Sequence, residues 1–89
     1  MSPITLEHPV TVAGEEITQL SMRRPRVKDQ LAAEKISGSD ADKEVRLFAN
    51  LCEVAPDVIE ELDMRDYSRL QGVYRRFLSP PEKPAAGPS

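Results

Sequence analysis

The stretch "ITLEHPVTVAGEEITQLSM", residues 4–22, decides the fold because its apolar residues alternate with polar ones. In its first half the apolar residues at even-numbered positions are Ile4, Leu6, Val10 and Val12. A period of two is typical of a strand with one buried face. Gly14 then supplies a residue that readily takes positive φ in a tight turn, and apolar residues follow again. The stretch predicts a β-hairpin.

The second half of this hairpin carries one irregularity. Leu20 and Met22 share a face, whereas Ile17 is out of phase with them. We therefore expect a bulge or an uncertain strand start at Ile17. In "RRPR", residues 23–26, Pro25 has no N–H for a ladder, so it ends the hairpin.

Three or four short helices are predicted after the hairpin. The first runs roughly from Val27 to Ile36. Ser39 and Asp42 resemble a capping box that starts the second helix, which runs to about Val54. The fold class is therefore α+β, an N-terminal hairpin followed by short helices.

Two further helix starts follow from residue types. Pro56 suits the first position of a short helix, and Asp63 suits the N-cap of the last one, with Asp66 at its N3 position. We expect one small domain over residues 1–78. The remaining "SPPEKPAAGPS", residues 79–89, has four prolines and no large apolar side chain, so it predicts a disordered tail or linker.

Composition bounds the possible functions. The chain has 89 residues, a net charge of −3, one cysteine and one histidine. A domain of this size has a modest core, so self-association is expected to help stabilise it. There is no apolar run of about 20 residues that would span a bilayer, and the first residues do not resemble a signal peptide, so we expect a soluble cytosolic protein.

The sequence offers few residues that could act in catalysis or bind a metal ion. His8 lies in a predicted strand before a proline, and Cys52 shares an apolar helix face, so both are interpreted as structural. Glu60, Glu61 and Asp63 are interpreted as a solvated acidic face. We predict no catalytic residue, no metal and no cofactor.

The predicted helix that starts near Asp40 has two apolar stripes. One contains Val45, Phe48, Ala49 and Cys52, and the other contains Leu47, Leu51 and Val54. Such a helix is either sandwiched inside its own domain or keeps one stripe for a partner. Both alternatives stay open, and the second makes Leu47, Leu51 and Val54 candidate partner-binding residues.

The last helix, "LDMRDYSRLQGVYRRFL" at residues 62–78, has an apolar arc opposite a basic stripe. The arc contains Tyr67, Leu70, Tyr74, Phe77 and Leu78, and the stripe contains Arg65, Arg69 and Arg76 with Arg75 alongside. The stripe is either an ordinary solvated face or a binding surface for an acidic protein or a nucleic acid. Gly72 within it hints at close approach of another backbone.

An acidic segment precedes this stripe. Residues 53–63 contain five acids and no base, so they could pair head to tail with the arginines of a second copy. A contact of this kind would weaken as the salt concentration rises.

Taken in order, these features resemble a known family. "ITLEHPVTVAGEEITQLSMRRPRVKDQLAAEK" resembles the opening of the small, Mu-like tail assembly chaperones of long-tailed bacteriophages, in which a hairpin with PV, a turn glycine and RRP leads into a helix. "LDMRDYSRLQGVYRRFL" resembles their closing helix. The resemblance covers residues 4–78.

The resemblance implies a non-enzymatic role. It implies binding of the tape measure protein, which is kept soluble in the host cytoplasm until tail tube subunits polymerise around it, and absence from the finished virion. In related phages a ribosomal frameshift adds a domain that recruits tube protein, so the proline-rich end would be a linker there. The family motif fixes no contact residues in this sequence.

Two rival hypotheses remain. A small nucleic-acid-binding regulator would use the arginine stripe, but the acidic total charge and the lack of a helix-turn-helix pair speak against it. An enzyme is the weakest alternative because no catalytic constellation is present.

Overall fold

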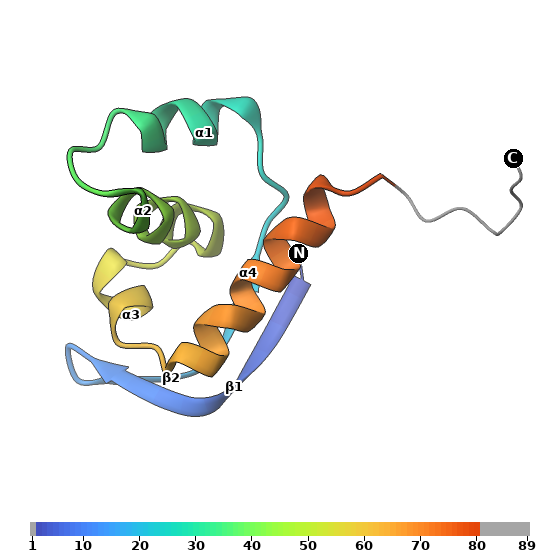
Figure 1. The fold of residues 1–89 in the computed structure, drawn as a ribbon. Helices are drawn as coiled ribbons and strands as arrows, with labels where there is room; N and C mark the ends of the chain where they lie inside the picture. The colour runs from blue at the N-terminus through green and yellow to red at the C-terminus, as the bar shows by residue number, and fades with distance from the viewer. Residues whose placement is uncertain (1, 81–89) are drawn as a thin grey trace, which may run out of the picture.

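The computed structural model describes residues 2–80 and shows an antiparallel hairpin followed by four helices (Figure 1). The elements are β1 (Ser2–Val12), β2 (Glu15–Met22), α1 (Val27–Glu34), α2 (Asp40–Cys52), α3 (Pro56–Glu60) and α4 (Met64–Leu78). The predicted α+β class is confirmed. Of the predicted tail, residues 81–89 lie outside the described residues.

The hairpin turns at Ala13 and Gly14, both with positive φ, at 53° and 80°. Two consecutive residues with positive φ make a tight turn whose twist matches that of the flanking strands. Ile4 pairs with Leu20 near the open end, and Val10 pairs with Ile17 near the turn. The apolar residues of both strands therefore point to one face.

The predicted irregularity exists, but it lies in the other strand. The register shifts between Thr5 and Val10 of β1, whereas Ile17 pairs regularly with Val10. Pro9 cannot donate to β2, and the N–H groups of Glu7 and His8 donate to a carboxylate of α4 instead. Because of the extra residues in β1, Val10 and its partner Ile17 face the same side of the hairpin as Ile4 and Leu20.

Helix starts follow the predicted caps. Ser39 Oγ accepts from the N–H of Asp42, whose carboxylate accepts from the N–H of Ser39, which completes the capping box of α2. Pro56 opens α3, and Asp63 Oδ2 accepts from the N–H of Arg65 at the start of α4. α2 ends at Cys52, two residues earlier than predicted, because Glu53 adopts a left-handed φ of 59°.

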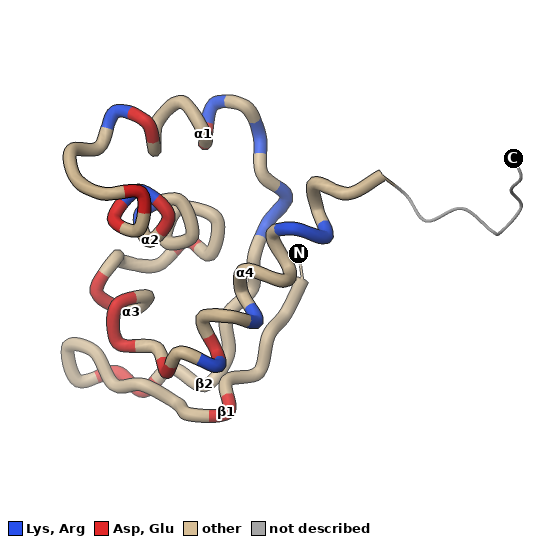
Figure 2. Tube along the Cα trace, viewed as in Figure 1, with Lys and Arg blue, Asp and Glu red and all other residues tan. Residues whose placement is uncertain are grey.

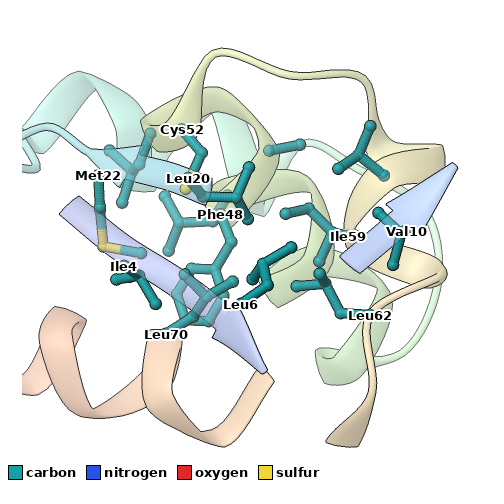
Figure 3. Close-up of a cluster of buried hydrophobic side chains, with 14 of the residues drawn as sticks. Ile4, Leu6, Val10, Leu20, Met22, Phe48, Cys52, Ile59, Leu62 and Leu70 are labelled. Carbon is teal, nitrogen blue, oxygen red and sulfur yellow. The ribbon is translucent and has the colours of Figure 1, made fainter. Parts of the chain in front are cut away.

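The core lies between the apolar face of the hairpin and the helices (Figure 3). α2 contacts β2, α1 and α3, while α4 packs along the hairpin. Phe48 is fully buried at the centre, with its ring centroid 5.6 Å from that of Tyr67 and 5.5 Å from that of Tyr74. The two tyrosines thus dock α4 on α2.

Candidate partner-binding surfaces

Both apolar stripes of α2 face the interior of the domain. From the stripe considered for a partner, Leu51 is fully buried, Leu47 is 6% exposed and Val54 is half-buried. On the opposite stripe Phe48, Ala49 and Cys52 are also buried. Of the two alternatives, the sandwiched helix is the one observed, and only the edge of Leu47 reaches a surface hollow.

The arginine stripe of α4 divides into two parts. Arg65 forms an ion pair with Glu7 of β1 at 3.4 Å, and Arg69 Nη1 lies 3.0 Å from Oδ1 of Asp66. Both guanidinium groups therefore already have anionic partners inside the chain. In this half of α4 the stripe is therefore not a row of unpaired cations, because β1 and Asp66 supply acids.

The second half of the stripe differs from the first. None of the ion pairs among the described residues includes Arg75 or Arg76, and both residues are exposed. A Cβ added at Gly72 would meet nothing within 4 Å, so no backbone of residues 2–80 requires a glycine there. Arg75 and Arg76 keep their charges available near the end of α4.

Asp66 is the structural anchor that sequence reasoning missed. It is fully buried, and its two oxygens accept from the N–H groups of Glu7 and His8, each at 3.0 Å. Burial opposes ionisation of Asp66, but these bonds and Arg69 outweigh it, so the pKa of Asp66 is lowered. Its position in the sequence could have indicated this burial, because Asp66 lies four residues before the buried Leu70 and therefore on the same helix face.

Two minor predictions have different outcomes. Cys52 is buried as expected, and burial raises the pKa of its thiol to about 11. His8, which we interpreted as a structural residue, is instead exposed, in the part of β1 where the register shifts. Of the residues described, no three His, Cys, Asp or Glu are grouped so as to hold a metal ion.

The connection between β2 and α1 is strongly basic. Arg23 donates to both oxygens of the buried Asp29, at 3.0 and 2.9 Å. These bonds lower the pKa of Asp29, whereas burial raises it and the N–H of Arg26 lowers it further. The net result is a pKa of about 2. Arg24 lies over the ring of Phe77 in α4, 5.6 Å from its centroid. The connection is thereby fixed to α1 and to α4.

Charge is segregated over the molecule (Figure 2). Basic residues follow the β2–α1 connection and the end of α4, whereas acidic residues mark α3 and the start of α2. Residues 23–35 contain five basic and two acidic residues, against five acids and no base in residues 53–63. The chain thus presents two surfaces of opposite charge despite its small net charge.

Two surface hollows lie beside α2. The first, of about 240 Å³, lies between α1, α2 and α4. Ala33, Leu47 and Tyr74 are its apolar residues, and Gln30, Glu34, Asp40, Lys43 and Glu44 are its polar ones. The second, of about 150 Å³, lies where α2, α3 and α4 meet and is lined by Val45, Ile59, Glu60, Leu62, Met64 and Tyr67. Each offers a small apolar floor with charged surroundings.

Comparison with known protein families identifies the family of this domain. A family model described as "Phage tail assembly chaperone proteins, E, or 41 or 14" matches residues 3–79. The chain belongs to this family of phage tail assembly chaperones. The match spans the hairpin and all four helices, so it confirms the resemblance found in the sequence.

Other comparisons add nothing to this family assignment. No curated protein and no solved structure matches the chain. Within residues 2–80 of this chaperone, no helix is both long enough and apolar enough to cross a membrane.

Proposed function

We propose that this chain binds the tape measure protein of its phage and keeps it soluble until tail tube subunits polymerise around it. The observation that carries the proposal is the family match over residues 3–79. The role is one of binding rather than catalysis, exerted in the host cytoplasm, and the chain is absent from the mature virion. A longer frameshifted form would recruit tube protein, with the proline-rich end as linker.

The hollow between α1, α2 and α4 is the client site that the geometry favours. It contains the exposed edge of Leu47, and α1 and α4 flank it without packing closely on one another. An amphipathic helix of the client would place one apolar side chain against Leu47 and Tyr74 and its polar flanks against the charged rim. Arg76 lies on the opposite side of α4 from Tyr74, where it lines a separate hollow with β1, so Arg75 and Arg76 would form a second contact outside this surface.

The proposed partners also include further copies of the chain. A core of this size gains stability from association, and the segregated charges supply a contact that operates between copies. Nucleic acid binding is disfavoured because the chain has a net charge of −3, which repels phosphate at long range.

Copurification of the tape measure protein with two tryptophan variants tests the client site. Gln30→Trp fills the first hollow from the exposed side of α1, while Ser68→Trp adds the same bulk to the exposed outer face of α4. We expect Gln30→Trp to reduce the copurified client and Ser68→Trp to leave it unchanged. The reverse pattern would move the client to the arginine side of α4, and no complex with wild type would refute the proposal for that client.

A further inference from the structure

The outward side of α1 is an unusual surface for so small a domain. Val27 and Leu31 are 77% and 58% exposed, although both are large and apolar. They lie one turn apart, opposite the buried Asp29 and Ala33 that attach α1 to the domain. The surface is an apolar ridge that no described part of the chain covers.

The charges beside this ridge are mainly basic. Lys28 and Lys35 lie three residues before and four residues after Leu31, so they share its side of the helix. Neither forms an ion pair among the described residues. A partner for the ridge therefore needs an apolar depression with an acidic border.

The second hollow has these two properties. Its floor is apolar, from Val45, Ile59 and Leu62, and Met64 beside it is 75% exposed. Glu60 is on the border, and the exposed Glu61 and Asp63 flank Leu62 in the chain. None of these three acids is in an ion pair within residues 2–80. The border is therefore acidic, and Glu60 and Glu61 are free to meet a basic partner, while Asp63 caps α4.

We propose that the ridge of α1 in one copy docks in the α3–α4 hollow of a second copy, with Leu31 over Met64 and Lys28 and Lys35 against Glu60 and Glu61. This inference rests on the proposed self-association, though not on the identity of the client. It replaces the arginines of α4 by the ridge of α1 as the basic side of the contact, because Arg65 and Arg69 are already paired.

The contact is head to tail. α1 and α3 lie on either side of α2, so each copy keeps one free ridge or hollow after the first contact forms (Figure 1). Such heterologous contacts continue into a ring or a filament. The client hollow and this hollow have no lining residue in common, so the two contacts use different residues of the same copy.

Two single variants separate the two halves of the contact. Leu31→Glu places an acid against the acidic border, and Met64→Lys places a base against the basic ridge. Leu31 and Met64 are both exposed, so the fold should persist, which circular dichroism and urea unfolding would verify. Leu78→Glu is the matched control, because Leu78 is 62% exposed and lies outside the contact.

Light scattering after size exclusion gives the readout. We expect wild type and Leu78→Glu to form salt-sensitive oligomers. Leu31→Glu and Met64→Lys, each on its own, should associate at least about tenfold more weakly than wild type. An equimolar mixture of Leu31→Glu and Met64→Lys should associate more strongly than either variant alone, because the intact ridge of Met64→Lys fits the intact hollow of Leu31→Glu.

The remaining outcomes overturn the proposal in distinguishable ways. A wild type that stays monomeric at all concentrations refutes self-association itself and this contact with it. Oligomers that both variants leave intact refute only the contact. A mixture of folded variants that stays monomeric refutes the head-to-tail pairing.

Discussion

Arg69 and Asp66 form an ion pair one turn inside α4, with Arg69 Nη1 3.0 Å from Asp66 Oδ1. The side chain of Asp66 is fully buried and its carboxylate also binds the backbone of β1, while the side chain of Arg69 is 41% exposed. This arginine therefore neutralises a buried anchor of the fold and is not a free contact for a partner. At the other end of the stripe, Arg75 and Arg76 form no ion pair among the described residues.

Replacement of Asp66 should strongly destabilise the domain. Asp66→Ala leaves the N–H groups of Glu7 and His8 without acceptors and Arg69 without its anion. We expect a loss of about 2–4 kcal/mol in the free energy of unfolding, measured by urea denaturation. Glu16→Ala, at an exposed acid outside every proposed contact, is the control and should change it by less than about 0.5 kcal/mol. Equal losses would show that Asp66 is no anchor.

The Arg23–Asp29 pair should make stability depend on acid pH. The pKa of Asp29 is about 2 in the folded chain, below its ordinary 3.8, so the ionised carboxylate favours folding above pH 3.8. This contribution, about 2 kcal/mol, is lost as the pH falls from 3.8 toward 2. Unfolding curves should show Asp29→Asn less stable than wild type at pH 6, with the difference shrinking toward pH 2. A constant difference would contradict this linkage.

Truncation to alanine should destabilise the domain strongly at Leu51 and hardly at all at Leu31. Leu51 is fully buried in α2, so Leu51→Ala should cost about 2–5 kcal/mol of stability by lost burial and a cavity. Leu31 is 58% exposed, so Leu31→Ala should change stability by less than about 0.5 kcal/mol. The midpoints of urea unfolding compare them, in monomeric samples at high salt. A small loss for Leu51→Ala would mean that this stripe is not packed inside.

The thiol of Cys52 should be inert in the folded chain. It is buried, its pKa is raised to about 11, and the thiolate is the reactive form. At pH 8 we expect slow reaction with a disulfide reagent in buffer and fast reaction in concentrated urea, followed by absorbance. Equally fast reaction in both would place Cys52 at the surface.

The hairpin and the helix starts were predictable because they depend on local sequence. Alternation fixes the strands, and the side chains of Ser39, Asp42 and Asp63 complete caps within three residues. The position of the bulge was not predictable, because it depends on Asp66, 58 residues after His8. Local pattern indicated an irregularity but not which strand carries it.

Candidate binding residues were predicted less well, because their burial and their charge partners also depend on residues that are distant in the sequence. Which stripe of α2 faces the interior depends on how α1, α3 and β2 pack on it, and this packing is not visible in the local sequence around the buried Leu51. Arg65 is paired with Glu7 across 58 positions of sequence. Arg75 and Arg76 remain candidates, and the ridge of Val27 and Leu31 emerged only once exposure was known.

The most direct test of the proposed function is the solubility of the tape measure protein in cells with and without this chain. We expect the client to move from the pellet to the supernatant when wild type is coexpressed, less with Gln30→Trp, and as with wild type for Ser68→Trp. A client that is equally soluble alone, or equally insoluble with abundant folded wild type, would contradict the proposed chaperone role toward it.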